Sequence, residues 1–170
     1  KVDLMRYKNH LIHMTQSMPI DIEYNTEVTS EYVANKQPDA IIIATGSTPI
    51  TPRIPGIDLP SVKHATTVYT DLSIVGDSVV VIGGGLVGCE TGLFLATEAG
   101  KKVTILEMLP EVATDEMHLT RDALLDRLNE HTTVITKARC TGITANGVTY
   151  VDGDGNEQTV ACDHVILSAG

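Results

Sequence analysis

Three glycines, Gly83, Gly85 and Gly88, follow the apolar run 79–82 with the spacing Gly-x-Gly-x-x-Gly. Gly83 permits a tight turn at the end of a strand, and Gly85 lacks the Cβ that would keep a pyrophosphate away from the backbone. Gly88 lets the following helix approach the sheet closely. These residue types at this spacing predict a turn that binds the diphosphate of a dinucleotide at the start of a helix.

The helix after this turn supports the same interpretation. Gly88, Gly92 and Ala96 recur every four residues and form a stripe of small side chains, which close packing against strands requires. Backbone N–H groups at the start of a helix point at a bound anion, and the positive end of the helix attracts it. The predicted cofactor contacts in this segment are Gly83, Gly84, Gly85, Leu86, Val87 and Gly88.

An acid, Glu107, ends the second apolar run 103–106 and lies 19 residues after Gly88. A carboxylate at this place accepts hydrogen bonds from both hydroxyls of the adenosine ribose. A 2′-phosphate carries about 1.5 to 2 negative charges, and one pair of like charges about 4 Å apart repels by about 4 kcal/mol at an effective dielectric near 20. Residues 108–120 contain no Lys or Arg that could receive such a phosphate. Glu107 therefore predicts a preference for NADH over NADPH, the alternative being an ordinary solvated acid at a strand end.

The first part of the chain predicts four elements. The periodicity of residues 2–16 indicates a helix, and alternation within residues 20–24 indicates a half-buried strand. A short helix is expected after a cap at Thr29 or Ser30. The continuous apolar run 40–43 is typical of a buried parallel strand.

The prolines of residues 49–60 predict a connector without regular structure. A helix is predicted over residues 115–129, with Thr114 or Asp115 as its cap and Met117 on its inner face. Three short strands separated by turns predict an antiparallel meander at 140–144, 148–151 and 158–161, and a last parallel strand at 165–167. The expected fold class is α/β and Rossmann-like, with a parallel sheet, this three-stranded meander, and part of a second similar domain.

Composition limits the function classes. The chain has 170 residues, 42% of them hydrophobic, and a formal net charge of −10. Acidic residues occur over the whole length, which argues against nucleic acid or an anionic membrane surface as a partner. The longest apolar runs are far shorter than a membrane span. The chain begins at Lys1 without a signal-like segment, so we expect a processed protein or a piece of a longer one.

Cysteine and histidine usage predicts neither disulfides nor metal. Cys89, Cys140 and Cys162 are widely separated and odd in number, which favours a reducing, cytoplasmic compartment. No Cys-x-x-Cys pair occurs, and Cys89 is expected to be a small core residue rather than a nucleophile. No metal site is expected, because His10 and His13 lack a carboxylate ligand at a suitable spacing.

Several motifs together resemble those of the flavoprotein pyridine-nucleotide oxidoreductases. They are PDAIIIATGS at 38–47, IPG at 54–56, VIGGGLVGCET at 81–91 and VILSAG at 165–170, and the resemblance extends over essentially the whole chain. Within that superfamily the chain is most similar to the C-terminal portion of the NADH:flavin oxidoreductases related to 2,4-dienoyl-CoA reductase, 2-enoate reductase and trimethylamine dehydrogenase. This finer resemblance depends on GCET at 88–91 and EMLP at 107–110.

The resemblance implies an NADH domain inserted into an FAD domain. Residues 1–56 would be a partial FAD-domain segment, 57–73 a connector, and 74–170 the NAD(P)H-binding domain. Glu90 would lie toward the nicotinamide end of the pocket, with a solvated helix acid as the alternative. The other cofactor contacts implied are Thr45 and Gly46 near the flavin, and Met108, Ala169 and Gly170.

The expected function is that of an NADH-binding module, which positions NADH for hydride transfer to FAD held mostly outside this chain. No second Gly-x-Gly-x-x-Gly precedes Gly83, and no residue is expected to be catalytic. The resemblance also implies FMN and an iron–sulfur cluster in a region N-terminal to this one. The expected partners are a nicotinamide dinucleotide and the remaining parts of the full-length chain. Two alternatives stay open: a non-catalytic ADP- or NAD-binding structural or sensing domain, and a glycine turn that binds FAD.

Overall fold

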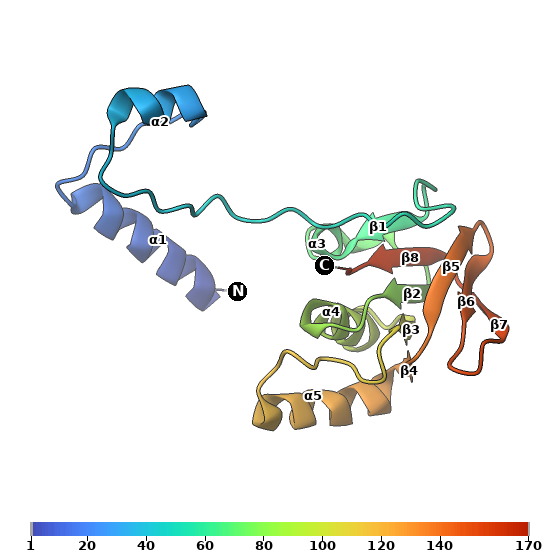
Figure 1. Ribbon diagram of the computed structural model, residues 1–170. Coiled ribbons are helices and arrows are strands. Elements are labelled where there is room, and N and C mark those ends of the chain that lie inside the picture. Colours follow the sequence, from blue (N-terminus) through green and yellow to red (C-terminus); the bar gives the residue numbers. More distant parts are fainter. Residues whose placement is uncertain (1, 170) are drawn as a thin grey trace. The chain divides into compact units, whose positions relative to one another are not determined.

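The computed structural model describes residues 2–169, so Gly170, one of the predicted cofactor contacts, lies outside the described residues. The chain divides into two compact units, Lys1–Gly46 and Ser47–Gly170. All strands of the described residues belong to the second unit (Figure 1). No helix within residues 2–169 has the length and apolar character needed to cross a membrane.

The second unit is built on a five-stranded sheet of order β1-β8-β2-β3-β4, in which every neighbouring pair is parallel. Its strands are β1 (Val62–His64), β2 (Ser78–Ile82), β3 (Lys102–Leu106), β4 (Thr133–Ile135) and β8 (His164–Leu167). β2 and β8 are central and mostly buried, as expected of parallel strands that are covered on both faces. The predicted parallel sheet is confirmed.

Alternate side chains of this sheet enter two core clusters, because successive residues of a strand point to opposite faces. Val79, Val81 and Ile105 pack against helices α4 (Leu86–Thr97) and α5 (His118–His131). Val80 and Leu106 on the other face pack against a three-stranded antiparallel sheet. That second sheet confirms the predicted meander and consists of β5 (Arg139–Thr144), β6 (Gly147–Val151) and β7 (Glu157–Ala161). Figure 1 shows the helices and the meander on opposite sides of the parallel sheet.

The connector is more structured than its proline content indicates. The proline-rich residues 49–60 contain no helix or strand, as predicted. Residues 57–73, the connector that the resemblance implies, contain β1, a short helix α3 (Ala65–Val68) and the beginning of the 3-10 turn η1 (Leu72–Ile74). β1 pairs with β8 and forms an edge of the parallel sheet. The division into a flavin-domain segment, a connector and a nucleotide domain stays a prediction.

The first unit contains two helices, α1 (Val2–Ser17) and α2 (Ser30–Lys36), both of which were predicted. Thr29 caps α2, because its hydroxyl accepts a 3.2 Å hydrogen bond from the N–H of Tyr32. The strand predicted within residues 20–24 is wrong, since this segment has no strand structure. Glu23 instead accepts 2.7 Å hydrogen bonds from the Tyr32 hydroxyl and from Lys36, which hold the segment against α2.

The strand predicted at 40–43 is also wrong. Ile41, Ile42 and Ile43 lie in irregular backbone, and the side chain of Ile42 is 92% exposed. A parallel strand requires hydrogen bonds to a neighbouring strand and cover on both faces. Within the described residues of the first unit no strand exists to supply them.

α5 begins later than predicted, at His118, and its N-cap residue Met117 makes no side-chain capping bond, so the predicted caps at Thr114 and Asp115 are wrong. Met117 is 75% exposed rather than on the inner face. Two hydrogen bonds hold the loop before the helix. The N–H of Ala113 donates to the Gly84 carbonyl at 2.8 Å, and Arg121 Nε donates to the Val112 carbonyl at 3.1 Å. Ala113 has φ 49°, and its carbonyl accepts a 3.2 Å hydrogen bond from the N–H of Glu116, so residues 113–116 form a turn before the helix.

Candidate dinucleotide-binding site

The glycine turn joins β2 to α4 in a backbone conformation that requires two of its glycines. Gly83 has φ 107°, and a Cβ there would overlap the Ser168 carbonyl after β8. A Cβ at Gly88 would overlap the carbonyl of Gly83 itself. Gly92, one helical turn later, brings the helix close to β3, since a Cβ there would lie 2.9 Å from Ile105 Cδ1. The predicted roles of Gly83 and Gly88 in the turn and in helix packing are therefore confirmed.

Gly85 differs from these glycines, because a Cβ built on it would meet no atom within 4 Å. It is the N-cap residue of α4 and makes no side-chain capping bond. The first N–H groups of a helix have no partner within the helix and need one from outside it. An open space thus lies beside Gly85, where a diphosphate would accept these hydrogen bonds.

Glu107 is buried, with 8% of its surface exposed, so the alternative of an ordinary solvated acid is wrong. Its Oε2 accepts a 2.6 Å hydrogen bond from the N–H of Gly84, and its Oε1 accepts one of 2.7 Å from the N–H of Leu109. Each carboxylate oxygen keeps a further lone pair. Glu107 can therefore accept two ligand hydroxyls while both of its oxygens stay fixed by the backbone.

A cavity of about 440 Å³ opens beside these groups, within the usual range for small-molecule sites. One part of its lining comes from the ends of the parallel strands and the residues after them: Ile82, Gly83, Gly85, Leu106, Glu107, Met108, Leu109, Asp115, Ser168 and Ala169. The other part comes from the connector and the start of the meander: Pro52, Ile54, Ala138, Arg139 and Cys140. In open α/β sheets ligands bind at the carboxyl ends of the strands, which is where this cavity lies.

A second cavity of about 360 Å³ shares Ser168 and Ala169 with the first. Its lining also includes Val87 from the first turn of α4, Ala65 from α3, and residues 47–50, at the start of the second unit. The residues after β8 therefore border both cavities, and together the cavities extend along the ends of the strands. Such an arrangement suits a long ligand with two bulky ends joined by a narrower middle.

Cys89 is buried below the turn, and its thiol donates to the Gly84 carbonyl at 3.3 Å. Burial raises the pKa of this thiol to about 11, and the nearby negative charges of Glu107 and Asp115 act in the same direction. A nucleophilic cysteine needs a lowered pKa. The prediction that Cys89 is a core residue is confirmed.

The other predicted contacts fall into three groups. Met108 and Ala169 line the first cavity, and Val87 lines the second. Gly84 lies in the packed turn, where a Cβ would come within 2.6 Å of Val112, and Glu90 is exposed on α4 without lining either cavity. Thr45 and Gly46 belong to the first unit, and their role stays a prediction.

Sequence reasoning missed the wall formed by Pro52, Ile54 and the segment 138–140. These residues reach the site only through tertiary contacts. The N–H of Ile143 donates to the Pro55 carbonyl at 2.8 Å, which joins the connector to the meander. The N–H of Ala138 donates to the Glu107 carbonyl at 2.8 Å, which places the start of the meander beside the end of β3. No local sequence signal indicates either contact.

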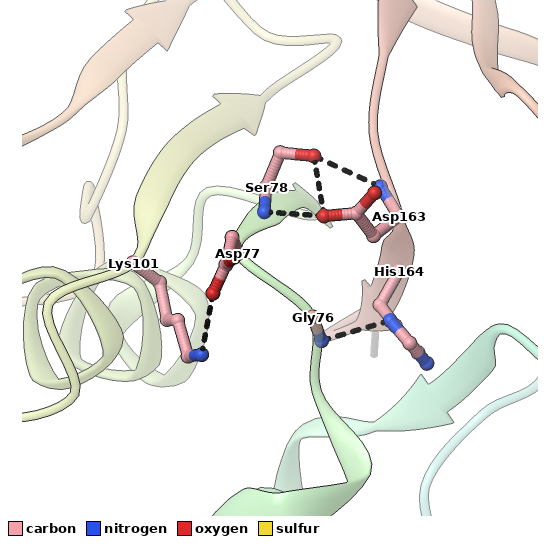
Figure 2. A network of polar contacts seen from close by, with 6 residues as sticks. All are labelled: Gly76, Asp77, Ser78, Lys101, Asp163 and His164. Atoms are coloured by element: carbon pink, nitrogen blue, oxygen red, sulfur yellow. Dashed lines mark hydrogen bonds and ion pairs between the residues drawn. The ribbon is translucent and has the colours of Figure 1, made fainter.

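A separate polar network lies at the opposite ends of the same strands, where β2 and β8 begin (Figure 2). Asp163 accepts hydrogen bonds from the N–H and the hydroxyl of Ser78 at 2.8 and 2.9 Å, and His164 Nδ1 accepts one from the N–H of Gly76 at 2.9 Å. These bonds join the first residue of each strand to a residue just before the other strand, and have a structural role. Among residues 2–169 no cluster of side chains could hold a metal ion.

The fold and this site define an α/β protein of the Rossmann-like, dinucleotide-binding type. The chain belongs to the pyridine nucleotide-disulphide oxidoreductase family, whose model matches residues 4–170. This membership confirms the resemblance to the superfamily, and the finer resemblance to NADH:flavin oxidoreductases stays a prediction.

Individual relatives are oxidoreductases. The chain is 32% identical to a bilirubin reductase of Mediterraneibacter gnavus (strain CC55_001C), over 100% of this chain and 26% of that protein. It is 36% identical to an NADH oxidase of Thermoanaerobacter brockii, over 89% of this chain and 24% of that protein. The structure of a 2-naphthoyl-CoA reductase in complex with 2-naphthoyl-CoA matches with a TM-score of 0.79 and 28% identity, over 99% of this chain and 25% of that one. The chain thus spans about a quarter of the length of these relatives.

Proposed function

We propose that this chain is the NADH-binding module of a flavin-dependent oxidoreductase, and that it positions NADH for hydride transfer to FAD held mostly outside the chain. The observation that carries the proposal is the cavity shared by Gly85 and Glu107. An open space beside the start of a helix suits a diphosphate, and a fixed, buried carboxylate suits the two hydroxyls of a ribose. Both groups belong to the same ligand in a dinucleotide.

The dinucleotide would lie along the ends of the parallel strands. Its diphosphate accepts hydrogen bonds from the N–H groups at Gly85 and the first turn of α4, and its adenosine occupies the first cavity with the ribose at Glu107. Its nicotinamide half extends past Ser168 and Ala169 toward the second cavity, which Val87 also lines. Glu90 on the same helix is the acid proposed for the nicotinamide end.

NADH supplies a hydride from nicotinamide C4 for transfer to flavin N5, so the protein mainly contributes position and electrostatics. The residues of this chain accordingly act by binding: the turn fixes the diphosphate, Glu107 fixes the ribose, and the apolar lining of both cavities excludes water. No proton transfer by a side chain is required of them. The buried thiol of Cys89, whose pKa is raised by burial, agrees with such a role.

A preference for NADH over NADPH follows from the charges in the first cavity. Glu107 and Asp115 both line it, and each would repel a 2′-phosphate. The NADH oxidase among the relatives also supports this choice.

The first unit, with Thr45 and Gly46, is proposed to be part of the FAD domain. Its exposed Ile41, Ile42 and Ile43 are side chains that a completed parallel sheet would bury. FMN and an iron–sulfur cluster are proposed for a region outside this chain, and the remaining parts of the full-length protein are its proposed partners. The proposed compartment is the cytoplasm.

Calorimetric titration of the chain with NADH and NADPH tests the proposal. We expect NADH to bind at least about tenfold more tightly than NADPH, which corresponds to about 1.4 kcal/mol. Binding of neither nucleotide would contradict the proposed function, and equal affinities would contradict the role of Glu107. A protein that stays colourless after incubation with excess FAD would exclude the alternative that the turn binds flavin. In a longer protein that includes the flanking segments, recovery of FAD and oxidation of NADH are expected, whereas NADH binding without oxidation would favour a sensing domain.

A further inference from the structure

Among the residues that the structure describes, Arg139 is the one cationic residue that lines the first cavity. It is the first residue of β5 and follows Ala138, which is almost fully buried. Arg139 is itself exposed, so it lies at the mouth of the cavity rather than deep inside it. None of the ion pairs found within residues 2–169 involves its guanidinium. The guanidinium therefore has its hydrogen-bonding and stacking capacity available for a ligand.

The position of Arg139 relative to Glu107 is fixed by the backbone. The N–H of Ala138 donates to the Glu107 carbonyl at 2.8 Å, and the N–H of Lys137 donates to the Leu109 carbonyl at 3.0 Å. The segment before β5 thus lies alongside the residues after β3. Met108 and Arg139 are next to these hydrogen-bonded residues and both line the first cavity, so a base attached to a ribose at Glu107 is expected to lie beside them.

We propose that Arg139 binds the adenine of the dinucleotide by placing its planar guanidinium over the face of the ring. This inference rests on the proposed function, in which adenosine occupies the first cavity, and it assigns a residue to the base. No aromatic side chain lines the cavity within the described residues, so no aromatic ring there can cover the base. A guanidinium is flat, weakly hydrated and stacks well on aromatic faces.

The acidic residues of the first cavity disfavour a second role for Arg139, that of binding a 2′-phosphate. Glu107 and Asp115 line the cavity with it and would repel the additional negative charge. Stacking on adenine, by contrast, is compatible with these acids, because adenine is neutral. The two roles differ in which ligands they affect, and binding measurements separate them.

The test measures dissociation constants of the 170-residue chain for NADH, NADPH, ADP and reduced nicotinamide mononucleotide. Arg139→Met keeps most of the side-chain length without the charge or the plane, and Arg139→Lys keeps the charge without the plane. We expect Arg139→Met to weaken NADH, NADPH and ADP alike by about 3- to 30-fold and to leave the mononucleotide, which has no adenine, unchanged. Arg139→Lys is expected to recover only part of the loss. Arg127→Met, an exposed residue of α5 outside the cavity, controls for the change in net charge.

Three patterns of altered affinity would overturn the inference: a loss confined to NADPH, an equal loss for all four ligands, or full recovery by Arg139→Lys. They would indicate a phosphate contact, a structural effect, and a purely electrostatic effect, respectively. If Arg139→Met leaves the affinities unchanged while the unaltered chain binds NADH tightly, this inference is overturned but the proposed function is not. Failure of the unaltered chain to bind NADH would overturn the proposed function as well.

Discussion

The backbone N–H of Gly84 donates a 2.6 Å hydrogen bond to Oε2 of Glu107, and this bond joins the turn after β2 to the end of β3. The N–H of Leu109 holds the other carboxylate oxygen at 2.7 Å. The element proposed to bind the diphosphate and the acid proposed to bind the ribose are thus connected without a ligand. Because the carboxylate is already oriented, little side-chain ordering is needed when the nucleotide binds.

Replacing the acid by its amide, Glu107→Gln, is expected to affect stability and binding together. An amide has one oxygen and one NH2 group, so one of the two N–H donors that face this buried side chain loses its acceptor. An unsatisfied buried donor costs about 1–3 kcal/mol, and the free energy of unfolding in urea should fall by that amount. The dissociation constant for NADH should rise about tenfold or more, and the preference over NADPH should shrink because a negative charge is removed.

Glu98→Gln provides the matched control, because Glu98 is exposed at the other end of α4. It removes the same charge and is expected to leave both affinities and the unfolding free energy unchanged. An unaltered NADH-to-NADPH ratio in Glu107→Gln would show that Glu107 does not select the nucleotide.

Alanine substitutions at two glycines of the turn should have different effects, one on NADH binding and the other on stability. Gly85→Ala places a Cβ in open space at φ −64°, which alanine adopts readily, so the thermal unfolding midpoint should stay the same. The Cβ occupies space needed by the diphosphate, and NADH binding should weaken by at least about tenfold. Gly88→Ala would overlap the Gly83 carbonyl and should lower the unfolding midpoint markedly. Unweakened NADH binding in Gly85→Ala would place the diphosphate elsewhere.

The raised pKa of Cys89, about 11 against an ordinary 9.0, predicts a pH dependence of stability. Between these two values the unfolded state releases the thiol proton while the folded state keeps it, so the free energy of unfolding falls as pH rises. The loss amounts to at most about 3 kcal/mol, at 1.36 kcal/mol for each pH unit. Urea unfolding at pH 8 to 10.5 measures this slope, and Cys89→Ala should show a shallower one. Equal slopes would mean that the thiol does not contribute.

The network at the far ends of β2 and β8 should affect stability but not binding. Hydrogen bonds from the N–H and hydroxyl of Ser78 lower the pKa of Asp163, so its contribution is present at neutral pH and is lost as pH falls below the ordinary value of 3.8. Asp163→Asn should lower the thermal midpoint at pH 7 and leave the NADH dissociation constant unchanged. Asp77→Asn, which removes an exposed ion pair with Lys101, should have a smaller effect. Weakened NADH binding in Asp163→Asn would contradict this purely structural role.

The sequence predicts those residues of the site that lie close together along the chain. β2, the glycine turn, α4 and β3 with Glu107 are consecutive, and Gly83 and Gly88 each have a steric reason that their spacing reveals. Pro52 and Arg139 line the same cavity from the connector and from the meander. Their placement depends on long-range contacts such as that between Ile143 and Pro55, which no pattern in the sequence encodes.

The wrong predictions also have physical causes. The apolar run at 40–43 indicates a strand only if neighbouring strands pair with it, and the described residues of its unit contain none. α5 does not begin at the expected caps Thr114 and Asp115, because these residues lie in a turn closed by a hydrogen bond from the N–H of Glu116 to the Ala113 carbonyl. In the first case the local propensity lacks the partner strands that a parallel strand needs, and in the second a local turn replaces the first part of the expected helix.

The most direct test of the central claim is a crystal structure of the chain with NADH. We predict that the adenosine ribose hydroxyls lie within hydrogen-bonding distance of the Glu107 carboxylate and that the diphosphate accepts from the N–H of Gly85. A diphosphate bound away from the turn, or a ribose without contact to Glu107, would contradict the account.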